Sequence, residues 1–218
     1  MIGLILPGAV AWSESFGDPV DGGLFPPEER AAARMVPARR REFAAVRVCA
    51  RQALGRLGVP PGPIVPGPRG EPGWPAGLVG SMTHCAGYQA AAVARATAVP
   101  VLGIDAEPHR PLPHGVYPTI SLPQERARRQ TLRTSHPEVH WDRLLFSVKE
   151  SVFKAWYPLT RRPLDFEEAD VVLQPDGTWR ARIRTTEGAP GAALPRGFAG
   201  RWLVADGLLA TVCSELLT

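Results

Sequence analysis

The chain has 218 residues, of which 44% are hydrophobic and 21% charged, and its net charge is +4. This composition indicates a soluble, folded protein with one large domain or two small ones, either of which can bury a sizeable core, and it excludes a disordered chain. The small positive charge favours acidic or phosphorylated partners, but it is too small to require nucleic acid. The three cysteines are far apart, at Cys49, Cys85 and Cys213. They predict a reducing, cytoplasmic location rather than a disulfide framework or a zinc site.

The first eleven residues are mostly apolar and end in Ala9-Val10-Ala11, which imitates a signal-peptidase site. No basic segment precedes the apolar run, and Pro7 interrupts it. We therefore expect a first core strand here. No other run approaches the length needed to cross a membrane, so no membrane association is predicted.

Two helices are expected next, a short one from Phe25 to Arg30 with prolines and acids in its first turn, and a longer one over residues 38–57. The longer helix begins with Arg39-Arg40-Arg41 and carries Arg40, Arg47 and Arg51 on one face. A solvated face is the default interpretation, and phosphate binding is the sharper one, because guanidinium groups bind phosphate oxygens bidentately. No aromatic residues are interleaved on that face, which weakens a nucleic-acid interpretation.

Residues 60–77 are crowded with proline and glycine and are expected to form a long loop. Three strands should follow, at Leu78–Thr83, Tyr88–Ala94 and Val101–Ala106. His84 lies in the turn after the first of them. It is either a structural histidine or a hydrogen-bond donor to an anionic oxygen.

Two acids, Asp105 and Glu107, lie at the exit of the third strand and point to the same face, with α-carbons about 7 Å apart. Mg²⁺ is commonly held by one or two acids together with substrate phosphates, so this pair is a candidate metal site. The alternative is a solvated strand edge. Gly103 lies on the same face and is expected to leave it open.

A proline-rich, polar segment over residues 108–140 is expected to link two halves of the chain. Within it, Ser121-Leu122-Pro123-Gln124 resembles a capping box that begins a charged helix. After the linker, a long helix precedes strands at Asp170–Leu173, Thr178–Arg184, Phe198–Ala205 and Leu208–Ser214. A helix followed by about three antiparallel strands thus occurs twice. This order predicts a pseudo-duplicated α+β fold with halves at residues 1–110 and 111–218, in which the acid strand of one half and the long helix of the other meet near the junction.

The long helix should cover Trp141 to Tyr157, and its apolar stripe points to a core: Leu145, Val148, Val152, Ala155 and Leu159. Glu150 lies on the opposite side. Glu150 and Lys154 could form a surface ion pair worth a few tenths of a kcal/mol. Their neighbours include large aromatic side chains, however, so we expect this face to be covered and the two charges to serve a site.

Three segments, Gly80–Cys85, Gly103–Glu107 and Phe146–Trp156, together resemble the Sfp-type 4′-phosphopantetheinyl transferases, most of all the enterobactin-synthase component D branch and its actinobacterial members. The resemblance extends from the helix at Arg39 nearly to the C-terminus. It implies a cytoplasmic, monomeric enzyme of pseudo-two-fold α+β fold, with its active site between the halves, of the kind that serves secondary metabolism. Such enzymes move phosphopantetheine from coenzyme A to a serine of acyl or peptidyl carrier proteins and release adenosine 3′,5′-bisphosphate.

The resemblance also implies catalytic roles for the charged residues. Asp105, Glu107 and Glu150 would bind Mg²⁺, with Mn²⁺ as a substitute, and Glu150 could also take the serine proton. Lys149 and Lys154 would hold phosphate oxygens, with Lys154 next to the developing charge.

Four further residues would bind coenzyme A by the same resemblance. Arg39 and Arg47 match positions that hold the 3′-phosphate, and His84 matches a histidine near the phosphates. Arg69 is the basic residue in a loop where family members often carry a lysine, which leaves the share of this loop in phosphate binding open.

Two other functional classes fit parts of the pattern. A metal-dependent nuclease or phosphohydrolase also needs acids and a lysine around Mg²⁺, but the chain lacks a further acid-rich motif. A non-catalytic basic module would bind nucleic acid in a salt-sensitive manner without any need for Glu150.

Overall fold

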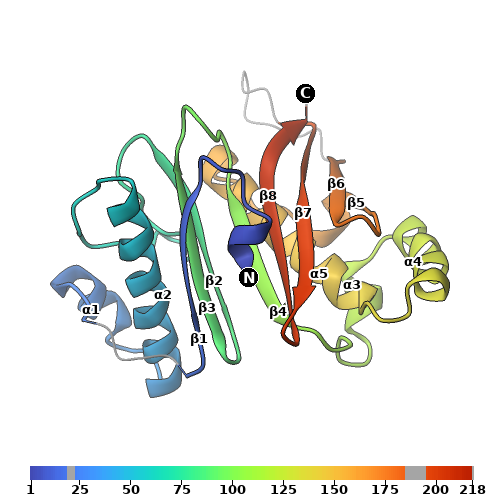
Figure 1. Cartoon of the computed structure of the whole chain (residues 1–218), viewed down its shortest axis with the longest axis horizontal. Helices are drawn as coiled ribbons and strands as arrows, with labels where there is room; N and C mark the ends of the chain where they lie inside the picture. The colour runs from blue at the N-terminus through green and yellow to red at the C-terminus, as the bar shows by residue number, and fades with distance from the viewer. Residues whose placement is uncertain (19–22, 185–194, 218) are drawn as a thin grey trace.

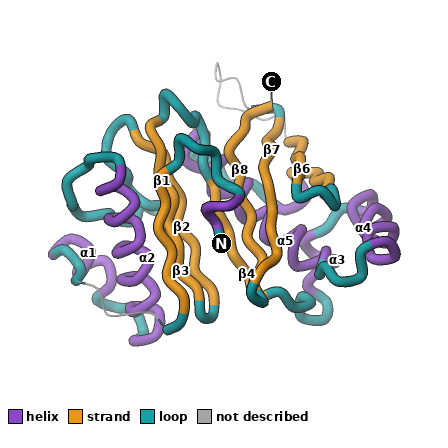
Figure 2. The backbone as a smooth tube through the Cα atoms, in the orientation of Figure 1, coloured by secondary structure: helices purple, strands orange, loops and turns teal. Residues whose placement is uncertain are grey.

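The computed structural model describes residues 1–18, 23–184 and 195–217. It contains two antiparallel sheets, each with one long helix packed against it (Figure 1, Figure 2). The helices are α1 (Pro26–Ala32), α2 (Pro37–Arg56), α3 (Val116–Ile120), α4 (Pro123–Ser135) and α5 (Trp141–Thr160), with 3₁₀ turns at Ile2–Leu4 and Phe166–Glu168. The predicted α+β class is confirmed. Within the described ranges, no helix combines the length and the apolar character that a bilayer crossing requires.

The sheets contain three and five strands. The first has the order β1-β3-β2, and the second has the order β4-β8-β7-β6-β5. Their bounds are β1 (Ala11–Phe16), β2 (Leu78–Cys85), β3 (Tyr88–Arg95), β4 (Gly103–Pro108), β5 (Ala169–Leu173), β6 (Thr178–Ile183), β7 (Gly197–Ala205) and β8 (Leu208–Leu217). Helix α2 covers the first sheet, and α5 packs against β4 and β8 of the second.

The first strand begins later than predicted, at Ala11. Residues before it form a 3₁₀ turn, and Ile2 and Ile5 are buried without joining a sheet. Proline at position 7 has no backbone N–H to contribute to a strand ladder, which is consistent with a strand that starts only after it.

Strand β4 was expected to complete the first sheet together with its two predecessors, but its backbone pairs with β8 of the second sheet. The second sheet therefore has five strands rather than about three, and β1 provides the third strand of the first. On the other side of β4, hydroxyl groups replace a backbone ladder: Ser81 and Thr83 of β2 accept hydrogen bonds from the N–H groups of Ile104 and Ala106, each at 3.0 Å. The junction between the sheets thus runs along the acid strand. The division at residue 110 stays a prediction.

Helix α5 approaches β4 closely because Gly103 has no side chain. A Cβ atom at Gly103 would lie 2.0 Å from the carbonyl oxygen of Ser151. The expectation that this glycine leaves the strand face open is therefore wrong, since the helix backbone fills the space. Four residues of the predicted stripe are buried, whereas Leu159 is 46% exposed. The buried cluster around α5 includes Trp156 but not Leu159, which lies in the last turn of the helix.

The basic face of α2 is covered in part: Arg47 and Arg51 are nearly enclosed, whereas 43% of the Arg40 side chain is exposed. This basic face is directed at α1, where the fully buried Glu28 lies 3.1 Å from Arg51 and 3.7 Å from Arg47, and Glu29 pairs with Arg40. Glu28 also accepts a hydrogen bond from the N–H of Ile64 at 2.8 Å, which ties the long loop to the same cluster. The stripe therefore holds α1, α2 and the loop together.

The charged helix of the linker begins one residue later than the predicted capping box. Leu122 is the N-cap residue, and its N–H donates to the Glu125 carboxylate at 2.7 Å. Ser121 instead donates from its hydroxyl to the carbonyl of Tyr117 at 2.6 Å. Pro123 accounts for the shift, because proline is favoured at the first helical position, where no N–H is needed.

Candidate active site

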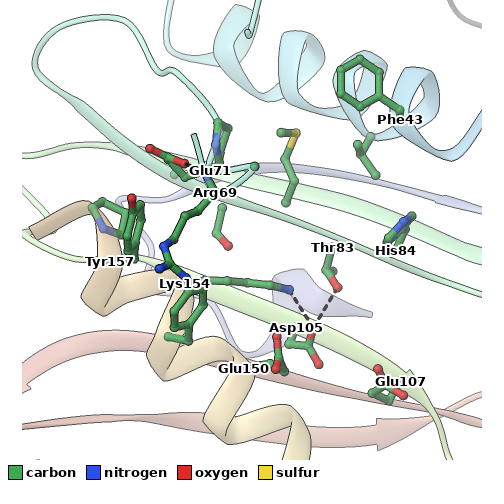
Figure 3. Close-up of a pocket in the computed structure, with 18 of the residues that line it drawn as sticks. Phe43, Arg69, Glu71, Thr83, His84, Asp105, Glu107, Glu150, Lys154 and Tyr157 are labelled. Carbon is green, nitrogen blue, oxygen red and sulfur yellow. Dashed lines mark hydrogen bonds and ion pairs between the residues drawn. The ribbon is translucent and has the colours of Figure 1, made fainter. Parts of the chain in front are cut away.

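A pocket of about 390 Å³ lies where α2 and β2 of the first sheet layer meet β4 and α5 of the second (Figure 3). Its walls come from α2, the loop at residues 69–72, β2, β4 and α5. The charged side chains that line it are Arg39, Arg69, Glu71, Asp105, Glu107, Glu150 and Lys154, with His84 beside them. The acid strand and the Glu150 helix, predicted from separate parts of the sequence, therefore face one cavity.

Asp105 is the most enclosed of these acids, with 5% of its surface exposed. One carboxylate oxygen accepts hydrogen bonds from Lys154 Nζ at 2.7 Å and from the Thr83 hydroxyl at 3.3 Å, as the dashed lines in Figure 3 show. The other oxygen accepts from the Ser147 hydroxyl at 2.7 Å. These contacts fix the orientation of the carboxylate in a site with little access to water.

Glu107 points toward the same cavity and is held by Arg143 of α5. The Arg143 Nη1 atom lies 2.8 Å from its carboxylate, and Arg143 also donates to the carbonyls of Arg110 and Pro111 at 3.2 and 3.0 Å. Burial and the nearby Asp105 charge raise the pKa of Glu107, and Arg143 opposes that rise. The guanidinium fork therefore sets the position of Glu107 and of the chain that leaves β4.

Glu150 differs from the other acids of the pocket. Within the described part of the chain, its carboxylate has neither a hydrogen-bond donor nor an ion-pair partner. Burial raises its pKa, the Lys154 charge lowers it, and the Asp105 charge raises it further. A partly buried carboxylate that is unpaired and has a raised pKa can accept a proton more readily than an ordinary glutamate.

At the other end of the cavity, Arg39 lies against His84, and Glu42 lies 3.3 Å from Arg39 and 3.2 Å from His84. Burial and the Arg39 charge both lower the pKa of His84, so the imidazole is largely neutral at pH 7. Arg39 pairs with Glu42, but about half of its side chain is exposed, so an incoming anion can reach the guanidinium. This corner is suited to bind an anionic group.

The long loop contributes Arg69 and Glu71. The Glu71 carboxylate accepts a hydrogen bond from the Arg69 N–H at 3.0 Å and pairs with Arg161, just after α5, at 2.9 Å. Figure 3 shows the Arg69 side chain reaching into the space between Tyr157 and Lys154. Glu71 therefore connects the loop that carries Arg69 to the end of α5.

Two predicted phosphate-binding residues do not line the pocket. Arg47 is buried and donates to the carbonyls of Ile64 and Phe43 at 3.0 and 3.1 Å. Lys149 is 3% exposed, and its ammonium donates to Glu125 at 2.8 Å and to the carbonyls of Ile120 and Phe166 at 2.9 and 2.7 Å. Both cations use their donors within the fold.

The predicted metal ligands Asp105, Glu107 and Glu150 all line the cavity. Each of the two glutamates has its pKa raised in part by the Asp105 charge, a repulsion that a divalent cation would relieve. The donor set is therefore suited to Mg²⁺. Among the residues that the structure describes, no three His, Cys, Asp or Glu side chains are grouped tightly enough to form a ready metal site. The carboxylates would have to draw together around the ion.

Sequence reasoning missed three residues that support the acids: Thr83, Arg143 and Ser147. Arg143 precedes Glu150 by seven residues, two helical turns, which places both on one side of α5. That spacing was the available signal for Arg143. No local pattern identifies Thr83 or Ser147, because each contacts Asp105 across a tertiary interface.

Comparison with known proteins shows similarity along nearly the whole chain. Residues 27–94 match the family model of the 4′-phosphopantetheinyl transferase N-terminal domain, and residues 101–204 match that of the 4′-phosphopantetheinyl transferase superfamily. Over 97% of its length, the chain is 54% identical to the 4′-phosphopantetheinyl transferase Svp of Streptomyces mobaraensis, of which 87% is covered. The corresponding identities are 47% to PptT of Mycobacterium tuberculosis and 45% to Npt of Nocardia iowensis, with 96% and 98% of those proteins covered.

Proposed function

The chain belongs to the 4′-phosphopantetheinyl transferase superfamily, and on that premise we propose that it moves phosphopantetheine from coenzyme A to a serine of apo acyl or peptidyl carrier proteins. The other product is adenosine 3′,5′-bisphosphate. The observation that carries this proposal is the shared cavity of the β4 acids with Glu150 and Lys154. Placement in the enterobactin-synthase component D branch and a role in secondary metabolism stay predictions.

Coenzyme A would bind along the cationic and apolar walls of the pocket. Arg39, Arg69 and Lys154 line it and can bind phosphate oxygens, with His84 as a further hydrogen-bonding group. The rest of the wall is largely apolar and suits the uncharged parts of the cosubstrate: Phe43, Val46, Met82, Phe146, Phe153 and Tyr157. We propose that Arg47 and Lys149 contribute indirectly, by holding α2 and α5 in place.

Asp105, Glu107 and Glu150 would hold Mg²⁺, or Mn²⁺ in its place. The ion would offset the negative charge of the pyrophosphate during attack on phosphorus. In the protein itself, Thr83 and Ser147 orient Asp105, and Arg143 orients Glu107. These contacts reduce the movement needed to bring the carboxylates together.

The proton of the attacking serine requires a base, and Glu150 is the acid of the pocket best suited to accept it. Its carboxylate is unpaired within the described ranges, whereas Asp105 and Glu107 are bonded to Lys154 and Arg143. Lys154 would bind the phosphoryl oxygens on which negative charge develops. We further propose a cytoplasmic monomer, in line with the three free cysteines at Cys49, Cys85 and Cys213.

The test is an intact-mass assay in which apo carrier proteins are incubated with the enzyme, coenzyme A and Mg²⁺. The expected result is an increase in carrier mass by one phosphopantetheine and the appearance of adenosine 3′,5′-bisphosphate. A carrier whose acceptor serine is replaced by alanine is the matched control. No mass increase with any of several acyl and peptidyl carriers would overturn the proposal, and release of inorganic phosphate or nicking of DNA would indicate a phosphohydrolase or a nuclease instead.

A further inference from the structure

Asp105 already has a cation bound to it, and that cation belongs to the protein. The Lys154 ammonium lies 2.7 Å from Asp105 Oδ1 and 3.1 Å from the carbonyl oxygen of Ile104. The second carboxylate oxygen accepts from Ser147, so both oxygens are engaged. Only 27% of the Lys154 side chain is exposed, and its contact with Asp105 is therefore weakly screened by solvent.

The other acids of the pocket show the same arrangement with one exception. Glu107 pairs with Arg143 at 2.8 Å, and Glu71 pairs with Arg161 at 2.9 Å. Glu150 alone has no partner among the described residues. Two of the three proposed metal ligands thus carry an internal counter-ion in the free protein.

Lys154 differs from Arg143 in the freedom it has to change partner. Arg143 is 9% exposed and also bonds two backbone carbonyls, which fix it to the chain beyond β4. Lys154 carries a compact ammonium on a flexible stem and lines the cavity itself. An anion that enters the pocket can therefore accept hydrogen bonds from Lys154 in place of Asp105.

We propose that Lys154 is the counter-ion of Asp105 in the free protein and that it excludes a divalent cation from this carboxylate. Exclusion ends when the pyrophosphate of the cosubstrate accepts hydrogen bonds from the ammonium instead. The inference rests on the proposed function, which supplies both the cation and the pyrophosphate. Its consequence is thermodynamic coupling: the cosubstrate raises the affinity for metal, and metal raises the affinity for the cosubstrate by the same factor. The free protein would then bind metal weakly, and the two would enter the pocket together.

Titration with Mn²⁺, followed by the electron paramagnetic resonance signal of the unbound ion, tests the proposal without any turnover. The wild type, Lys154→Met and Lys154→Arg are compared with and without coenzyme A. In its absence, Lys154→Met should bind Mn²⁺ about tenfold more tightly than the wild type, because a like charge has been removed from a ligand. Lys154→Arg keeps the charge and should stay close to the wild type.

Arg161→Met is the matched control. It also removes one cation that is paired with an acid of the pocket, but its partner is Glu71 and its side chain is 67% exposed. In the absence of coenzyme A, we expect the Mn²⁺ affinity of Arg161→Met to equal that of the wild type. With coenzyme A present, the advantage of Lys154→Met should disappear, because wild-type Lys154 then has a phosphate partner.

Equal or weaker Mn²⁺ binding by Lys154→Met without coenzyme A would overturn the inference, as would an equal gain in Arg161→Met. Circular dichroism verifies that each variant is folded, and Lys154→Gln replaces Lys154→Met if that variant is not. If the wild type modifies carriers but Lys154→Met gains no Mn²⁺ affinity, the inference is overturned and the proposed function stands. A wild type that binds no Mn²⁺ under either condition would overturn the metal site of the proposed function as well.

Discussion

Lys149 and Glu150 are neighbours on one helix, yet their surroundings are opposite. The Lys149 ammonium is buried on the far side of α5 and donates to three acceptors: the Glu125 carboxylate and the carbonyls of Ile120 and Phe166. The Glu150 carboxylate faces the cavity and has no partner among the described residues. Consecutive residues of a helix point about 100° apart, so Lys149 reaches three acceptors while Glu150 reaches the cavity and none.

The difference teaches which charges are available for chemistry. A buried ion with all its donors used is costly to disturb and has nothing left for a ligand. An unpaired carboxylate with a raised pKa is kept in that state at some cost in stability, which is typical of functional sites. Lys149 fixes one side of α5, and that attachment determines where Glu150 points.

The largest effect should come from Glu150→Gln. The substitution keeps the size of the side chain but removes the proton acceptor, so we expect the rate of transfer to fall by about 10²- to 10⁴-fold. Single-turnover intact-mass measurements provide the rate, and circular dichroism checks the fold. A loss below tenfold would show that Glu150 is neither the base nor an essential metal ligand. The contrast between a structural Lys149 and a functional Glu150 would then be wrong.

Lys149→Met tests the structural role of the other residue, Lys149. Glu125 would be left buried and unpaired, so the free energy of unfolding should fall by about 3–5 kcal/mol in urea titrations. Combining Lys149→Met with Glu125→Gln should restore part of that loss, because the buried charge is removed while the amide oxygen can still accept from a backbone N–H. If Lys149→Met were instead as stable as the wild type but bound coenzyme A poorly, Lys149 would be the phosphate ligand that the family resemblance implied.

Arg143→Lys tests whether an ion pair on the pocket side of α5 also stabilises the fold, as the Lys149 pair does. The variant keeps the charge near Glu107 but cannot reproduce the fork that also bonds the carbonyls of Arg110 and Pro111. We expect a loss of about 1–3 kcal/mol in the free energy of unfolding. A variant with unchanged stability would show that the fork does not hold the exit of β4.

The pH dependence of stability provides a smaller but sharper test of Glu150. Because its folded-state pKa is raised, mainly by burial, its stabilising contribution is complete below the pKa of the unfolded chain and is lost as pH rises through the folded pKa. Glu150→Gln should therefore raise Tm by a few degrees at pH 7–8 and have little effect near pH 4. Thermal scans at both pH values check this. A lower Tm at pH 7–8 would mean that the ionised carboxylate is stabilised by a partner.

The smallest effect is expected for Arg161→Met, which breaks a largely exposed ion pair with Glu71. Its stability should change by less than about 1 kcal/mol. Because Glu71 also holds the loop that carries Arg69, we expect KM for coenzyme A to rise severalfold while kcat is unchanged. Steady-state kinetics separate the two constants, and a fall in kcat with constant KM would contradict this role.

Local pattern was sufficient to predict much of the fold. Periodicity identified α2, α5 and the strands from β2 to β4 to within a few residues, and it placed Glu150 opposite the apolar stripe. Alternation along β4 placed Asp105 and Glu107 on one face, and both line the pocket. These features depend only on neighbours in the chain.

What covers a given face could not be read from local pattern. The basic face of α2 looked solvated or phosphate-binding because its partner Glu28 lies in the preceding helix. Lys149 looked available because Glu125 lies 24 residues before it. Gly103 looked like open space because the helix that fills it begins nearly forty residues later, at Trp141. In each case a tertiary contact decided the role.

The pairing of β4 with β8 has a consequence for how the protein acquires its active site. Gly103 lies opposite Cys213, so about a hundred residues must be synthesised between the acid strand and its partner. Such long-range pairing is slow, and until it occurs the edge of β4 that β8 will occupy is open to other strands. During synthesis on the ribosome, β4, which carries Asp105 and Glu107, would therefore remain unpaired on this edge until β8 emerges. The carboxylates proposed to bind metal would be among the last groups to reach their final positions, and interruptions between the two strands should favour aggregation over partial activity.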